Sequence, residues 1–164
     1  VGSEMCIRDS SYNGWGDVLV IIFFGFVPVG GTYYVQALTW TPDVTIASFI
    51  CGLLIDTLLV VNNYRDREAD ARSGKRTVIV RFGEKFGRYF YLLLGISASL
   101  LCLYFLREGH IYAALLPQFY LVPHVLTWRR MVKIHSGKKL NSILGETSRN
   151  MLFMGILLAI GMIL

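Results

Sequence analysis

Five long apolar stretches constrain this chain of 164 residues more than any other feature. They cover approximately residues 18–38, 46–61, 89–106, 111–128 and 151–164. A helix that crosses a bilayer needs about 17 to 25 mostly apolar residues. We therefore expect the two shorter stretches to be extended, the second into the Asn62-Asn63 turn and the fifth from near Thr147. With 54% hydrophobic residues, the chain is too apolar for an ordinary soluble domain. The pattern predicts an all-α, polytopic membrane helix bundle of about five transmembrane helices.

The connections between these stretches differ strongly in charge. Residues 62–88 and 129–149 carry an excess of Lys and Arg over Asp and Glu, whereas the turns at 39–45 and 107–110 hold little charge. By the positive-inside rule, the two long basic connections are cytoplasmic, which predicts a multi-pass protein of the inner or plasma membrane. This bias also explains the net charge of +5 without a nucleic-acid partner. The chain lacks the interleaved aromatic and basic residues that are typical of single-strand binders.

A cluster of polar side chains follows the second apolar stretch. On a helix that turns about 100° per residue, Asn62, Asn63, Asp66 and Asp70 lie within one arc of roughly 100°. Two carboxylates one turn apart repel each other, and a shared cation would remove that repulsion. Mg²⁺ prefers oxygen ligands and usually lies between protein carboxylates and a substrate phosphate. The nearby cations that suit phosphate oxygens are Arg65, Arg72, Lys75 and Arg76. The cluster therefore predicts a diphosphate site with Asp66 and Asp70 as metal ligands.

A simpler interpretation is that these residues form a solvated, basic loop, as in any helical membrane protein. The spacing alone does not decide between the two. The order of residues favours the site, because N-N-x-R-D-x-x-x-D-x-x-x-G-K-R-T resembles the second aspartate motif of UbiA-type membrane prenyltransferases. Similar segments of that family match residues 23–25, 31–36, 80–83 and 140–141. The resemblance covers roughly residues 12–164 and is strongest to the menaquinone branch, which prenylates 1,4-dihydroxy-2-naphthoate.

The resemblance implies an enzyme that transfers a polyprenyl group from prenyl diphosphate to 1,4-dihydroxy-2-naphthoate, giving demethylmenaquinone. Asp66 and Asp70 would then be catalytic residues that hold Mg²⁺, while Asn62 and Asn63 orient ligands or substrate. Other aromatic acceptors of the family remain open, namely 4-hydroxybenzoate, homogentisate, and haem or chlorophyll precursors. A non-enzymatic bundle, such as part of a transporter, is a further alternative, although the sequence shows no internal repeat of the kind found in many transporters.

The resemblance also suggests that the chain is incomplete. Its five stretches correspond to the last five of nine helices, and the first aspartate motif of the family has no counterpart here. We expect an N-terminal half to supply that motif and this chain alone to be inactive. Residues 1–10 resemble a translated adapter sequence, so we expect a non-native leader followed by the prenyltransferase segment at 11–164.

Asp56 is the most unusual residue within an apolar stretch. It lies six residues before Asn62, about 9 Å deeper along a helix, and on the side of Asn63. An acid at that depth is costly and marks a speculative site residue. The alternative is a neutral, hydrogen-bonded carboxyl group that joins two helices. The histidines and cysteines lack the spacing of a metal site, so we expect none there.

Overall fold

The computed structural model describes residues 14–164, so the predicted leader at 1–10 lies outside the described residues. Its helical segments are α2 (Gly16–Val20), η1 (Ile21–Gly31), α3 (Thr32–Ala37), α4 (Pro42–Arg72), α5 (Val78–Cys102), η2 (Leu103–Leu106), α6 (Ile111–Leu115), η3 (Leu116–Tyr120), α7 (Leu121–Ile134) and α8 (Leu140–Ile163). They join end to end into five rods, and residues 14–164 contain no strand. The prediction of an all-α bundle is confirmed.

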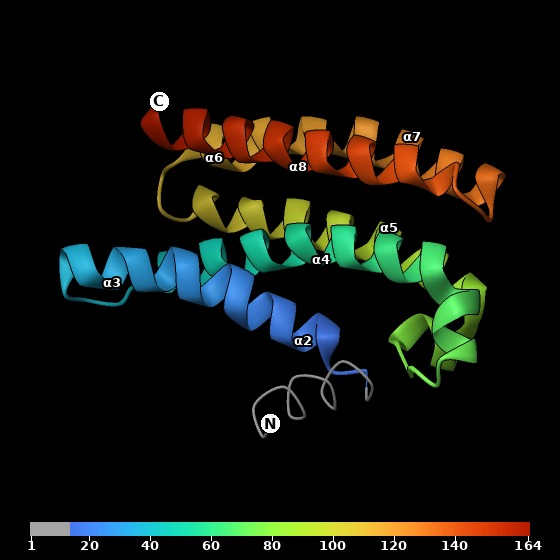
Figure 1. Ribbon diagram of the computed structural model, residues 1–164. Coiled ribbons are helices and arrows are strands. Elements are labelled where there is room, and N and C mark those ends of the chain that lie inside the picture. Colours follow the sequence, from blue (N-terminus) through green and yellow to red (C-terminus); the bar gives the residue numbers. More distant parts are fainter. Residues whose placement is uncertain (1–13) are drawn as a thin grey trace, which may run out of the picture.

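The rods lie side by side, with α4 and α5 in the middle of the bundle (Figure 1). The first rod, α2 to α3, packs against α4 on one side, and α7 and α8 cover the other side. Consecutive rods are joined by turns at alternating ends (Figure 1). The turns at 73–77 and 135–139 therefore lie at the same end of the bundle, which we call the basic end.

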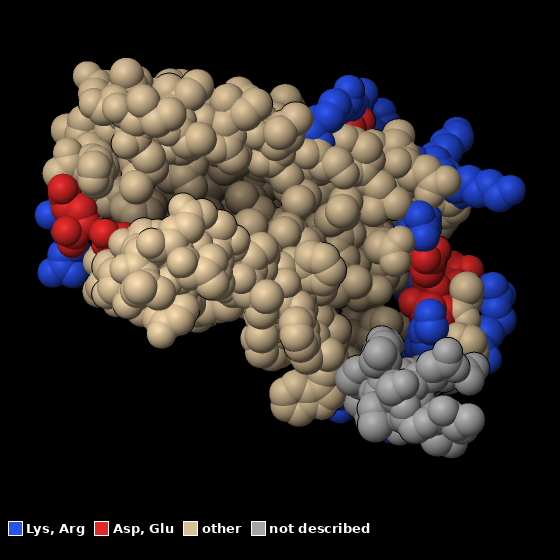
Figure 2. Space-filling model, turned by 60° about the vertical axis from the view of Figure 1, so that its left-hand side comes forward, with Lys and Arg blue, Asp and Glu red and all other residues tan. Residues whose placement is uncertain are grey.

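Four helical segments are long and apolar enough to cross a membrane: Gly16–Ala37, Pro42–Arg72, Val78–Leu106 and Leu140–Ile163. The remaining rod, at 111–134, is interrupted by Pro117 and carries basic residues in its last turns. In the view of Figure 2, charged side chains gather at the two ends of the molecule and an uncharged belt lies between them. This distribution is the one expected of a multi-pass membrane protein.

Close packing between the first rod and α4 depends on two glycines. A Cβ atom on Gly25 would lie 2.5 Å from the carbonyl oxygen of Ser48, and one on Gly52 would lie 2.9 Å from Cα of Ile21. Real Cβ atoms do not approach other atoms so closely, so any side chain would push the helices apart. Small residues of this kind allow membrane helices to gain contact by close backbone approach. The first rod is thereby held along α4, next to the predicted site.

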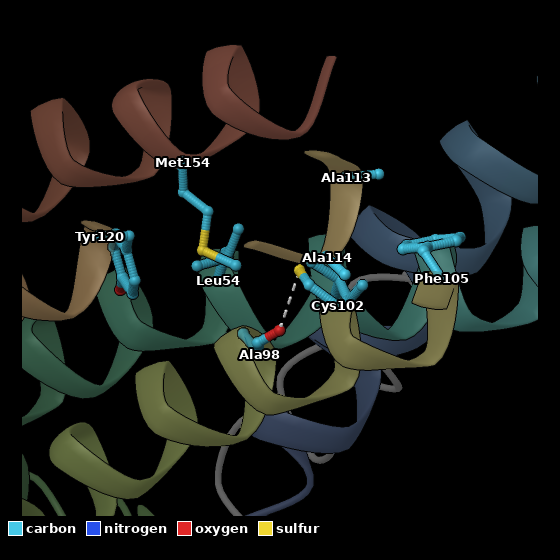
Figure 3. Packing of buried hydrophobic residues seen from close by; sticks show 9 residues of the cluster. Leu54, Ala98, Cys102, Phe105, Ala113, Ala114, Tyr120 and Met154 are labelled. Carbon is cyan, nitrogen blue, oxygen red and sulfur yellow. Dashed lines mark hydrogen bonds between the residues drawn. The ribbon is translucent and has the colours of Figure 1, made fainter. Parts of the chain in front are cut away.

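Buried apolar side chains form two clusters along the bundle. The cluster farther from the basic end includes Leu54, Ala98, Cys102, Phe105 and Met154 (Figure 3). Within it, the thiol of Cys102 donates to the carbonyl oxygen of Ala98 at 3.4 Å, so this cysteine is a packing residue. The second cluster includes Val60, Tyr64, Tyr91, Met131 and Ile143. It packs directly behind the polar last turns of α4.

Candidate active site

Helix α4 positions the predicted motif. Thr41 caps its start by accepting a hydrogen bond from the backbone N–H of Val44 at 3.4 Å, and Pro42 fits the first turn. The helix then continues unbroken through the apolar stretch to Arg72, six residues beyond Asp66, in a segment rich in helix-forming residues. All of the motif up to Arg72 therefore lies on one rigid helix.

A tight turn closes the site after α4. Gly74 adopts a positive φ of 79°, a conformation that favours glycine. The backbone N–H of Lys75 donates to the carbonyl oxygen of Asp70 at 3.0 Å, which reverses the chain. The turn brings the Lys75 ammonium group to 3.2 Å from the Asp70 carboxylate. The Gly-Lys pair of the motif thus places a cation directly beside the second aspartate.

One pocket of about 200 Å³ gathers the key residues of the motif. Its lining includes Asn62, Asn63, Asp66, Asp70 and Lys75. The start of α2 and the turn at 73–77 form the other walls, because Asp17 and Thr77 also line it. The helical spacing of the motif predicted that the amides and carboxylates share one face, and the structure places them around one cavity.

Arg65 lies beside this pocket and holds Asp66 through two short hydrogen bonds. Its Nε and Nη2 atoms donate to the two carboxylate oxygens at 2.7 and 2.6 Å. The same guanidinium group donates to Oδ1 of Asn62 at 2.8 Å and to Oδ1 of Asn141 on α8 at 3.1 Å. Arg65 therefore connects the first aspartate of the motif with an amide one turn earlier and with the start of the last helix.

The carboxylates suit a cation that is shared with a substrate. Residues 14–164 contain no group of three or more His, Cys, Asp and Glu side chains that could hold a metal ion by themselves. Mg²⁺ usually takes one or two protein carboxylates and completes its shell with water and phosphate oxygens. Asp66 and Asp70 on one wall of the pocket fit that incomplete set. Their amide neighbours Asn62 and Asn63 add further oxygen ligands or hydrogen-bond donors.

Two predicted diphosphate ligands lie elsewhere. Arg72 and Arg76 are exposed, and neither lines this pocket in the part of the chain that is described. Arg72 ends α4, and Arg76 follows Lys75 in the closing turn. Their predicted contact with a diphosphate remains a prediction.

Asp56 lies deeper in the bundle than this pocket and is fully buried. Neither of its carboxylate oxygens accepts a hydrogen bond from a donor in residues 14–164. The carboxyl group of Asp17, on α2, is its close polar neighbour across the interface with α4. Two carboxylates that face each other in an apolar environment are costly, so this pair is an unusual feature of the interface. Asp17 also lines the pocket, so this pair joins the pocket to the apolar interior.

The face of α4 opposite to the pocket is held by Glu84 on α5. Its carboxylate accepts a hydrogen bond from the buried hydroxyl of Tyr64 at 2.8 Å and pairs with Arg88. It also lies 2.7 Å from Nδ1 of His135, just after α7, and 3.6 Å from Arg67. These contacts fix the last turns of α4 against α5 and the connection between α7 and α8.

The model of the UbiA prenyltransferase family matches residues 10–163. The chain is 41% identical to 1,4-dihydroxy-2-naphthoate octaprenyltransferase of Escherichia coli (strain K12) over 96 residues, which is 58% of this chain and 31% of that protein. It is 28% identical to 2-carboxy-1,4-naphthoquinone phytyltransferase of Synechocystis over 90 residues, 55% of this chain and 29% of that protein.

A third relative aligns along most of the chain. UbiA prenyltransferase domain-containing protein 1 of Dictyostelium discoideum is 28% identical over 158 residues, 93% of this chain and 45% of that protein. The chain therefore covers less than half of the length of each of these three relatives. No solved structure matches the chain.

Proposed function

This chain belongs to the UbiA prenyltransferase family, as its motif predicted, and we propose that it is part of an enzyme that transfers a polyprenyl group from prenyl diphosphate to 1,4-dihydroxy-2-naphthoate. The observation that carries this proposal is the pocket at the end of α4, where two carboxylates, two amides and a lysine share one small cavity. Such a pocket suits a metal-bound diphosphate. The naphthoate acceptor is supported by the name of the Escherichia coli relative.

An apolar groove adjoins the same helix. It has a volume of about 670 Å³ and is lined by side chains of η1, α4 and α8, including Cys51 and Ile55. On α4, Cys51, Ile55 and the pocket residue Leu59 follow one another at intervals of four, so they lie along one helix face. The face that is apolar in the groove thus becomes polar at the pocket. A polyprenyl diphosphate has the same division between an apolar chain and a charged head.

The residues of the pocket would act on the leaving diphosphate. Asp66 and Asp70 would hold Mg²⁺, which when bound neutralises charge on the diphosphate oxygens. Arg65 and Lys75 already lie beside these carboxylates and can donate charge-assisted hydrogen bonds to phosphate oxygens. Asn62 and Asn63 would orient the head group. Because the relatives extend well beyond the matched region, we also propose that further helices complete the diphosphate site.

Product analysis of the full-length enzyme tests the proposed acceptor. The enzyme would be incubated with Mg²⁺, a polyprenyl diphosphate and either 1,4-dihydroxy-2-naphthoate, 4-hydroxybenzoate or homogentisate. We expect mass spectrometry to find demethylmenaquinone from the naphthoate and no prenylated product from the other two acceptors. Transfer to one of the other acceptors alone would contradict the proposal, while absence of transfer to all three would contradict the prenyltransferase activity itself.

Substitution of Lys75 tests its contact with the diphosphate. Lys75→Ala should raise the apparent KM for prenyl diphosphate about tenfold or more, because one charge-assisted hydrogen bond is worth about 1.5 to 3 kcal/mol. Lys75→Arg should have a smaller effect, since it keeps the positive charge. Lys85→Ala serves as a control, because Lys85 is exposed on α5 and does not line the pocket within the described residues. Equal KM values for all three variants would place Lys75 outside the substrate site.

A further inference from the structure

A second polar pocket lies between α7 and α8 and has a volume of about 410 Å³. It shares no lining residue with the pocket at the end of α4 among residues 14–164. Three arginines line it: Arg129 and Arg130 from α7 and Arg149 from α8. Figure 2 shows that basic side chains gather at this end of the bundle. We call this cavity the arginine pocket.

The polar floor of the arginine pocket is built from buried side chains. Asn150 is 9% exposed and donates from its amide nitrogen to the hydroxyl of Thr127 at 2.9 Å. Thr127 is 3% exposed and donates to Oε2 of Glu146 at 3.3 Å. The other oxygen of Glu146 accepts a hydrogen bond from Arg130 at 2.6 Å. A chain of hydrogen bonds from α8 to α7 and back therefore fixes Arg130 in place.

The other two arginines carry charge that this network does not neutralise. Arg129 and Arg149 are exposed and form no ion pair with any residue in the described range, 14–164. Three arginines and one glutamate give the pocket a net charge of +2. Its chemistry therefore favours an anion, and guanidinium groups suit phosphate oxygens in particular.

The arginine pocket also borders the apolar belt of the bundle. Pro123 and Leu126 line it on α7, and Leu126 is 54% exposed. Val122 and Phe153, close to the pocket residues in sequence, expose 62% and 40% of their surface. The pocket thus lies where apolar helix surface meets basic residues. In a membrane protein, this is the level of the lipid head groups.

We propose that the arginine pocket binds the phosphate head group of an anionic phospholipid, with the acyl chains along the exposed apolar side chains of α7 and α8. Basic pockets between helices at the membrane surface recognise such head groups. A prenyl diphosphate also combines phosphate with an apolar chain, but the site proposed for it is the pocket at the end of α4. Among residues 14–164, the arginine pocket also shares no lining residue with the apolar groove along α4.

Lipid binding to the full-length protein tests the proposal without any measurement of activity. Native mass spectrometry would compare retention of phosphatidylglycerol with that of phosphatidylcholine of the same acyl chains. We expect selective retention of phosphatidylglycerol, and the double substitution Arg129→Gln, Arg149→Gln should weaken it about tenfold or more. The matched control is Lys138→Gln, Lys139→Gln, which removes the same charge from the exposed turn between α7 and α8 and should leave retention close to the native level.

Four results would overturn the proposal. Equal retention of the two lipids would show that the head-group charge is not recognised. An equal loss in both double variants would show attraction by the general charge of this surface. Displacement of phosphatidylglycerol by an equimolar prenyl diphosphate would assign the pocket to that substrate. Unchanged retention in the double variant Arg129→Gln, Arg149→Gln would place the lipid elsewhere.

The two double variants should have the same unfolding temperature in lipid-free detergent. The milder substitution Arg149→Lys keeps the charge and should retain the lipid.

Discussion

Asp66→Asn and Asp70→Asn should each reduce the turnover of the full-length enzyme about a hundredfold or more. Both carboxylates line one pocket and would hold the cation that stabilises the leaving diphosphate. Removal of one preorganised electrostatic stabiliser typically costs about 3 kcal/mol of transition-state stabilisation. Asparagine keeps the size of the side chain and loses the charge, so the change isolates the electrostatic contribution. The measurement is kcat at saturating prenyl diphosphate across a Mg²⁺ titration.

The control for this prediction lies on the same helix. Glu68 is exposed and does not line the pocket within residues 14–164, so Glu68→Gln should keep turnover within about twofold. The unfolding temperatures of all three variants should stay close to that of the native protein, because Asp66 and Asp70 pair mainly with partly exposed cations. Near-normal, Mg²⁺-dependent turnover in either aspartate variant would contradict the metal-site assignment.

The sequence predicts the pocket face of α4 well because that face is a local property. Residues at intervals of three and four share a helix face whatever packs against it. The arrangement of Asn62, Asn63, Asp66 and Asp70 could thus be derived from spacing alone. The position of Lys75 depends on the turn at Gly74, which is also local. Arg76, one residue farther along, shows where this reasoning ends, because no feature of the local sequence indicates that its side chain is exposed.

The lengths of the helices were harder to predict from hydropathy. The second apolar stretch ends near Asn63 and the fifth begins near Thr147, whereas α4 continues to Arg72 and α8 begins at Leu140. Hydropathy reports which residues can lie in a membrane and gives no information on where a helix ends. Beyond the apolar stretch, α4 is continued by alanine, arginine and glutamate, which favour helix. This continuation keeps the motif rigid.

Contacts between distant segments could not be predicted at all. Asp17 immediately precedes the first apolar stretch, and only the packing of α2 on α4 brings it to Asp56 and the pocket. Glu84 belongs to the basic connection at 62–88, which its charge alone predicts to be cytoplasmic. In the structure it lies within α5 and binds Tyr64, twenty residues earlier. Nothing in the sequence distinguishes Asp17 or Glu84 from other acidic residues. The tertiary structure determines which residues they contact.

Gly95→Ala should strongly destabilise the bundle, because Gly95 lies directly against the ring of His124. A Cβ atom at this position would overlap the imidazole. The ring has little room to move, since it stacks on Tyr91 and Tyr120 with centroids 4.6 and 5.0 Å away. It also donates from Nε2 to the carbonyl oxygen of Leu92 at 3.3 Å and accepts from the Tyr120 hydroxyl at 2.9 Å. Overpacking of this kind costs about 1 to 3 kcal/mol and sometimes more.

Gly145→Ala on α8 is the matched control for this substitution. Apart from the nearby backbone of α8 itself, no atom of the described residues lies within 4 Å of the Cβ position at Gly145, and alanine favours helix over glycine by about 1 kcal/mol. The two variants should therefore shift the unfolding temperature in opposite directions when measured in the same detergent. If the loss at Gly95 comes from the ring, His124→Ala should cost less in the Gly95→Ala background than in the native protein. Strict additivity of the two substitutions would show that Gly95 and His124 do not interact, and the close packing of α5 on α7 would then need another explanation.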